Sequence, residues 1–168
     1  MEDGIRAVIP EPPVAAIGFS MGAQALLRIE ADTPGTFERL LVAGIGANLF
    51  VPADRRQPDM VADAILGRRE ATDPLTRAFR QSAVTPPNEP EAMAACLRRG
   101  AAPITEEDLA KVACPVLVLV GDADPVAVPA DRLVAALPAA RLVTLKGADH
   151  LGTMKSFEFL DAALEFLG

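Results

Sequence analysis

The sequence is poor in the residues that most metal and cofactor sites need. It contains one histidine and two cysteines, and no group of these residues has the spacing of metal ligands. A glycine-rich phosphate-binding loop is missing as well. We therefore expect no metal and no nucleotide cofactor. The two cysteines, Cys96 and Cys114, lie in apolar patterns and are expected to be buried free thiols in a reducing compartment.

Long apolar runs and basic stretches are also missing. No apolar run approaches the roughly 20 residues of a membrane-spanning helix, and the first residues lack the basic and apolar blocks of a secretory signal. The formal net charge is −7, with acidic and basic residues interspersed, which argues against nucleic acid or an anionic membrane as a partner. We expect a soluble, cytoplasmic protein whose 168 residues form one domain.

The stretch from residue 14 to residue 22 predicts a strand, a sharp turn and the start of a helix. Four apolar residues lead into Gly18, Ser20 follows at the tip, and Gly22 opens a helical pattern. The two glycines are expected to let strand and helix approach closely, leaving the Ser20 hydroxyl exposed at the helix N-terminus. The backbone N–H of Met21 would then face an oxyanion formed on a carbonyl that Ser20 attacks. The alternative is that Ser20 only caps the helix.

A nucleophilic serine needs a base, and the base needs a carboxylate to orient it. His150 is the single histidine of the chain. Asp124 is the favoured carboxylate, because it follows an apolar run that predicts a buried strand. Asp122 follows the same strand and competes for this role, although it could instead bind local backbone N–H groups in a turn. Asp149 is expected to be a solvated neighbour of the base.

Three short motifs carry these candidates in a fixed order: Gly18-Phe-Ser20-Met-Gly22, Gly121-x-x-Asp124 and Gly147-x-x-His150. In these motifs and their order the sequence resembles the α/β-hydrolase superfamily, particularly its small esterase and lactonase-like members. The resemblance implies a reduced α/β-hydrolase fold, with Ser20, Asp124 and His150 as catalytic triad and Met21 as oxyanion-hole donor. Its Gly-x-x-Asp spacing favours Asp124 over Asp122. It also implies a small-molecule ester as the substrate.

The apolar pattern predicts an α/β fold with about four parallel strands and flanking helices, the strands lying at 14–19, 40–46, 115–120 and 141–145. The helix after Ser20 is expected to bury one apolar face and to expose Arg28, Glu30 and Asp32. The last helix is expected to expose its acidic residues and to bury a stripe made of Phe157, Leu160, Leu164 and Leu167.

Residues 48–113 differ in character from the rest of the chain. They are rich in proline and in charged residues, which predicts short amphipathic helices near 58–69, 73–83, 90–99 and 105–112. We interpret this stretch as a helical cap or lid inserted into the single domain of residues 1–168. In members of the resembled family such caps line the substrate pocket. The alternative is that these helices simply cover the sheet.

The sequence departs from the family before the elbow. Members usually carry several further strands there, and the loop after one of them supplies the second oxyanion donor. Here residues 1–13 precede the first strand, so that strand is expected to lie at an edge, with a homodimer covering it. Two functions stay open: a serine hydrolase that cleaves small, largely apolar carboxylic esters through an acyl-enzyme on Ser20, and a non-catalytic remnant that binds or merely folds.

Overall fold

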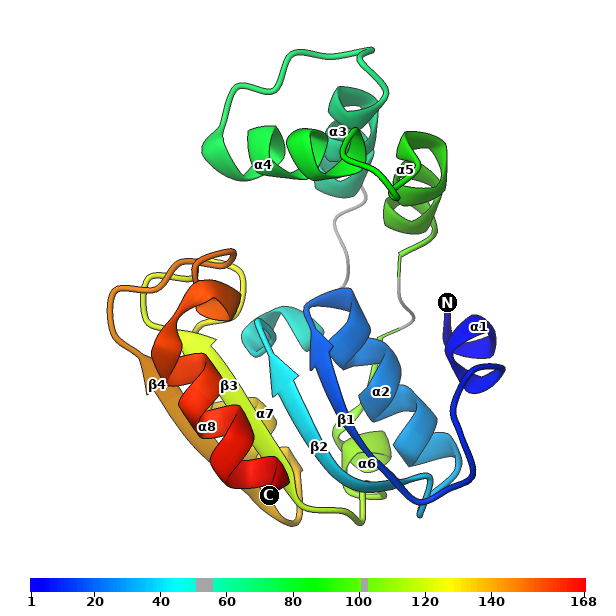
Figure 1. The fold of residues 1–168 in the computed structure, drawn as a ribbon, viewed down its shortest axis with the longest axis vertical. Coiled ribbons are helices and arrows are strands. Elements are labelled where there is room, and N and C mark those ends of the chain that lie inside the picture. Colours follow the sequence, from blue (N-terminus) through cyan, green and yellow to red (C-terminus); the bar gives the residue numbers. More distant parts are fainter. Residues whose placement is uncertain (51–55, 101–102) are drawn as a thin grey trace. The chain divides into compact units, whose positions relative to one another are not determined.

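The computed structural model describes residues 1–50, 56–100 and 103–168. The chain divides into two compact units, one of residues 1–51 and 103–168 and the other of residues 52–102. None of the helices in the described ranges combines the length and the apolar character that a membrane span requires. The elements are α1 (Glu2–Arg6), β1 (Val14–Phe19), α2 (Met21–Asp32), β2 (Phe37–Ala43), η1 (Ala47–Leu49), α3 (Arg56–Ile65), α4 (Pro74–Ala83), α5 (Pro90–Arg99), α6 (Glu106–Leu109), β3 (Val116–Gly121), α7 (Asp131–Ala136), β4 (Ala140–Leu145), η2 (Thr153–Lys155) and α8 (Phe157–Leu167) (Figure 1).

The first unit is built on a parallel sheet of four strands, which confirms the predicted fold class. The strand order is β1-β2-β3-β4, so β1 lies at one edge as expected. Strand β2 ends at Ala43 rather than at residue 46, because the chain leaves the extended conformation at Gly44, where φ is +67°. Because all four strands are parallel, their carboxyl ends lie at the same edge of the sheet. Parallel α/β folds place their ligand sites at this edge.

Helices cover the two faces of this sheet (Figure 1). On one face, Leu27 of α2 and Leu133 of α7 belong to the same buried cluster as Val118 of β3. On the other face, α8 contributes Ala163 to a smaller cluster with Leu119. Every residue of β3 is buried. The cover on both faces explains why this strand is a continuous apolar run rather than an alternating one.

Helix α2 buries the predicted apolar face, but Glu30, which was predicted to face outward, is completely buried. Its two carboxylate oxygens accept hydrogen bonds from the backbone N–H groups of Gly35 (2.8 Å) and Phe37 (2.9 Å). Buried polar groups are tolerated when they are paired in this way. The carboxylate therefore fixes the turn that leads from α2 into β2.

Helix α8 turns a different face to the sheet than the sequence predicts. Phe157, Leu160 and Leu164 are 82%, 51% and 63% exposed, so the predicted inward stripe is wrong. The side chains that pack on the sheet are Phe159, Ala162, Ala163 and Phe166. Small alanine side chains let the helix approach the strands closely, while the two phenylalanines fill the space beside them.

Helix α8 and strand β1 both carry exposed apolar side chains. Glu165 of α8 forms an ion pair with Arg141 of β4 (3.5 Å), which directs the acidic side of the helix toward β4. Leu160 and Leu164 lie on another side of the helix and are exposed. On β1, Ile17 points to the same sheet face as α8 and is 49% exposed. Ile17 therefore leaves an exposed apolar side chain on the edge strand of the sheet.

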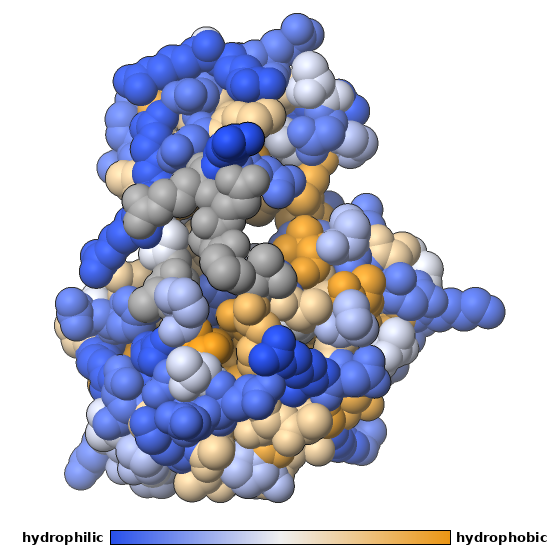
Figure 2. All heavy atoms as spheres, turned by 180° about the vertical axis from the view of Figure 1, so that it is seen from behind, coloured by the Kyte–Doolittle hydropathy of each residue, from blue (hydrophilic) through white to orange (hydrophobic). Residues whose placement is uncertain are grey.

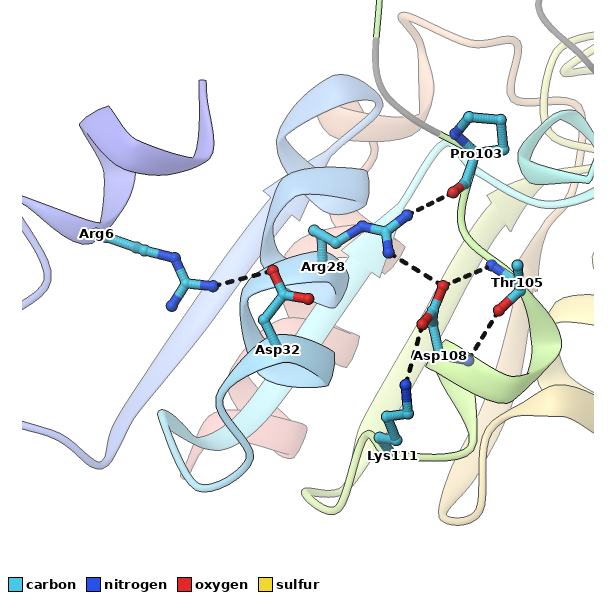
Figure 3. Close-up of polar contacts among 7 residues, drawn as sticks. All are labelled: Arg6, Arg28, Asp32, Pro103, Thr105, Asp108 and Lys111. Carbon is cyan, nitrogen blue, oxygen red and sulfur yellow. Dashed lines mark hydrogen bonds and ion pairs between the residues drawn. The ribbon is translucent and has the colours of Figure 1, made fainter.

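A network of ion pairs and hydrogen bonds holds the residues after Pro103 on α2 (Figure 3). Arg28 of α2 donates to the Asp108 carboxylate (3.0 Å) and to the Pro103 carbonyl (2.5 Å). Asp108 also accepts from Lys111 and forms a capping box with Thr105 at the start of α6. Hydrogen bonds from Thr105, Lys111 and Arg28 hold the pKa of Asp108 well below its ordinary value. The end of the predicted insertion therefore belongs to the first unit.

The second unit has a small core of its own. Helices α3, α4 and α5 bring together Ala62, Ile65, Ala83 and Ala94. Asp73 caps α4 by accepting the backbone N–H of Thr76 (2.8 Å), and Arg98 of α5 pairs with Asp63 of α3 (2.6 Å). The face of this unit that Figure 2 shows is mostly hydrophilic. Its interpretation as a cap stays a prediction.

The homodimer expected from the sequence also stays a prediction, and the exposed Ile17 on the edge strand β1 gives it a specific test. We expect light scattering coupled to gel filtration to give twice the chain mass at micromolar concentration. The substitution Ile17→Lys should yield monomers, because a lysine on an edge strand opposes pairing with another chain.

The matched control is Val84→Lys, which changes an apolar side chain that is 55% exposed in the second unit. This variant should remain dimeric. A wild-type chain that elutes as a stable monomer over the whole micromolar range contradicts the prediction.

Candidate active site

Ser20 occupies a strained turn between β1 and α2. Its φ is +51°. Among the described residues, all others with a positive φ are glycines. A sparsely populated backbone conformation of this kind costs about 1–3 kcal/mol. The turn is held because Ser20 N–H donates to the Ala43 carbonyl (2.8 Å) and Gln24 N–H donates to the Ser20 carbonyl (3.1 Å). Ser20 is half-buried, and backbone strain of this kind is typical of functional sites.

Only one of the two elbow glycines is needed for the close approach of strand and helix. A β-carbon on Gly18 would lie 2.7 Å from the Cα atom of Ala23, in the first turn of α2. A β-carbon on Gly22 would meet nothing within 4 Å. The expectation is therefore confirmed for Gly18 and wrong for Gly22.

The structure brings Ser20, His150 and Asp124 into one chain of hydrogen bonds. The Ser20 Oγ atom lies 3.2 Å from His150 Nε2, and His150 Nδ1 lies 2.8 Å from Asp124 Oδ2. These residues follow β1, β4 and β3 respectively, so the carboxyl edge of the sheet assembles them from distant parts of the sequence. His150 is 4% exposed and Asp124 is completely buried.

Asp124 is held in its loop by backbone donors. Its Oδ1 atom accepts the N–H groups of Val126 (2.8 Å) and Ala127 (3.2 Å), while Oδ2 faces His150. Burial by itself raises the pKa of Asp124, but the hydrogen bonds from His150 and the two backbone groups outweigh it, so the pKa lies below its ordinary value. Asp124 is therefore an ionised acceptor at neutral pH, and His150 Nδ1 is the protonated ring nitrogen.

The competing carboxylates have other partners. Asp122 is exposed, and its Oδ1 atom accepts the backbone N–H of Gly147 (2.6 Å). Asp149 is also exposed and accepts the backbone N–H of Gly152 (2.6 Å). Asp122 thus binds the loop that carries His150 rather than the imidazole itself, so its partner is a backbone N–H as expected but one from a distant loop and not from its own turn.

Close backbone contacts, which sequence reasoning missed, hold the three loops together. A β-carbon on Gly121 would lie 2.0 Å from the carbonyl oxygen of Ala148, and one on Gly46 would lie 1.9 Å from that of Ala127. The loop after β3 therefore touches both the loop after β2 and the loop that carries His150. The glycines were visible in the sequence, but their contacts are between residues distant in the chain.

Met21 follows Ser20 directly and begins α2. The first N–H groups of a helix have no carbonyl partner within the helix, and the helix dipole favours negative charge at this end. The position of Met21 fits the expected oxyanion donor.

Comparison with known proteins places these features in context. The sequence model of the alpha/beta hydrolase family matches residues 2–162. No curated protein matches the chain. Many solved structures do, at sequence identities that establish the fold alone.

A hydrolase from Pseudomonas aeruginosa PA01 is 23% identical, with a TM-score of 0.76 over 99% of this chain and 70% of its own. An esterase from Exiguobacterium antarcticum is 18% identical, with a TM-score of 0.73 over 99% of this chain and 72% of its own. A bromoperoxidase from Bacillus anthracis is 21% identical, with a TM-score of 0.63 over 93% of this chain and 67% of its own. Because the family model spans nearly all of the sequence and the fold agrees, this chain belongs to the alpha/beta hydrolase family.

Proposed function

We propose that the chain is a serine hydrolase that cleaves small, largely apolar carboxylic esters through an acyl-enzyme on Ser20. The observation that carries the proposal is the continuous relay from Ser20 Oγ through His150 to Asp124, with distances of 3.2 Å and 2.8 Å. A serine, a base within hydrogen-bond reach and a carboxylate that orients the base are the three parts of nucleophilic acyl transfer.

In the first half of the reaction, the Ser20 oxygen attacks the ester carbonyl and its proton moves to His150 Nε2. Asp124 holds the other ring nitrogen and stabilises the imidazolium that forms. The carbonyl oxygen becomes an oxyanion, which the N–H of Met21 stabilises. The tetrahedral intermediate then breaks its bond to the alcohol oxygen, which takes the proton from His150 and leaves as the alcohol.

In the second half, water replaces the alcohol. His150 Nε2 takes a proton from the water as the water oxygen attacks the acyl carbon, and the same oxyanion site is used again. The bond to Ser20 Oγ then breaks, Ser20 recovers its proton from His150, and the carboxylic acid leaves. The reaction therefore needs neither a redox group nor a second nucleophile from the chain.

The ester class is supported by the relatives. The solved structures similar to this chain include carboxylesterases, esterases and an enzyme described as degrading N-acyl homoserine lactones. A bromoperoxidase with the same fold is also among them, and one fold can serve several reactions. The relay of Ser20, His150 and Asp124 favours acyl transfer among these.

One prediction from the proposed function concerns the nucleophile. Wild-type protein should hydrolyse short-chain p-nitrophenyl esters and bind a fluorophosphonate probe covalently, whereas Ser20→Ala should lose both properties. Losses at triad positions run to roughly 10⁴–10⁶ in kcat. Spectrophotometric turnover and mass spectrometry of the probe adduct measure the two effects.

A control variant, Ser82→Ala, changes a serine of α4 in the second unit and should behave as the wild type. Activity of Ser20→Ala within tenfold of the parent rules out Ser20 as the nucleophile. A wild-type chain that neither turns over esters nor accepts the probe favours the non-catalytic alternative.

Another prediction separates the two carboxylates that follow β3. Asp124→Asn should lower kcat by on the order of 10⁴, because an asparagine favours the wrong imidazole tautomer. Asp122→Asn should have a far smaller effect, since Asp122 binds the backbone of Gly147 and not the ring of His150. Steady-state kinetics of both purified variants tests this, and a larger defect in the Asp122 variant would reverse the assignment.

A further inference from the structure

His150 lies in an irregular segment between β4 and η2, so no helix or strand fixes its side chain. Its two ring nitrogens are hydrogen-bonded, but the last torsion of a histidine side chain has a broad energy minimum. Two bonds at opposite ends of the ring still allow the ring to tilt about the line that joins them. Some further contact must therefore set the plane of the imidazole.

Two residues next to the relay supply such a contact. The ring of Phe19 lies against His150, with ring centroids 4.8 Å apart and an angle of 44° between their planes. Gly44, directly after β2, leaves room for both rings. A β-carbon on Gly44 would lie 2.6 Å from Phe19 Cε2 and 3.1 Å from His150 Cε1. A distance under 3.0 Å cannot be accommodated unless the Phe19 ring moves.

We infer that Phe19 and Gly44 are positioning residues that together form a slot for the imidazole of His150. Phe19 packs on the ring, and the backbone of Gly44 limits the approach at Cε1. The catalytic meaning of the slot rests on the proposed function, because the slot holds Nε2 in line with Ser20. The slot itself is a structural claim that can be tested without turnover.

The slot couples the base to the nucleophile. Phe19 precedes Ser20 in the chain and ends β1, and its backbone pairs with Ala43, the residue before Gly44. A displacement of the Phe19 ring would therefore act on His150 through the ring contact and on Ser20 through the backbone. A misplacement of about 1 Å in a catalytic group can cost about 10²-fold in rate.

The single histidine of the chain gives a direct measurement. Protein labelled with ¹⁵N only in histidine has one pair of ring nitrogens, those of His150. In the wild type we expect a protonated Nδ1, an unprotonated Nε2 and a low-field Nδ1 proton that exchanges slowly with water. These signals report on the ring whether or not the protein is an esterase.

The test variants are Gly44→Ala, which places a methyl group in the slot, and Phe19→Leu, which keeps an apolar side chain but removes the ring. Both should shift the nitrogen signals toward a mixture of tautomers and broaden or remove the Nδ1 proton. With p-nitrophenyl esters, Gly44→Ala should lower kcat by about 10²-fold with little change in KM. Phe19→Leu should lie between this variant and the wild type.

Gly35→Ala is the matched control, because Gly35 also has positive φ (+89°) but has nothing within 4 Å of an added β-carbon. It should keep the wild-type histidine signals, which separates the effect of the slot from that of backbone strain. If Gly44→Ala does not fold by circular dichroism, Phe19→Leu decides alone. Folded variants with unchanged His150 signals overturn the inference, whereas normal signals in an inactive wild type overturn only the proposed function.

Discussion

The buried hydrogen bond between Asp124 and His150 is the contact on which the arrangement of the site depends. Both side chains are almost completely removed from solvent, and a buried carboxylate is tolerated only when it is paired. The two residues lie in loops after neighbouring strands, β3 and β4, which are paired from Val116 with Ala140 onward. This register sets the bond, and the bond in turn aims the second ring nitrogen at Ser20. The pairing of β3 with β4 and the hydrogen bonds of the site therefore require the same placement of Asp124 and His150.

The space around that bond is limited by backbone rather than by side chains. At Gly121 and Gly46, the chain passes so close to a neighbouring carbonyl oxygen that a β-carbon would lie within 2.0 Å of it. Gly44 leaves the same kind of room for the rings of Phe19 and His150. Larger residues at these points would push the three loops apart. Precision at the site thus comes from glycines that bring three loops together.

The sequence predicts the parallel strands well, because strand patterns are local, and the three candidate residues that it names lie within hydrogen-bond distance of one another. It fails where the outcome depends on a partner elsewhere in the chain. Glu30 has the spacing of an exposed residue, yet the N–H groups of the following turn draw it inside. Helix α8 has two apolar faces, and hydrophobicity alone favours the leucine stripe. Packing instead selects the face whose alanines let the helix lie close to β2 and β4.

The edge position of β1 places the candidate nucleophile directly after an edge strand of the sheet. Ser20 and Met21 follow directly on the strand whose outer backbone groups have no neighbouring strand in the described sheet. If Met21 is the oxyanion donor that we propose, a second donor would matter, since the loss of one such donor costs about 10²–10³ in kcat. A chain segment that paired with the outer edge of β1 would end beside Ser20, where a second donor is needed. We propose that one association covers the edge strand β1 and completes the oxyanion site, in which case turnover depends on that association.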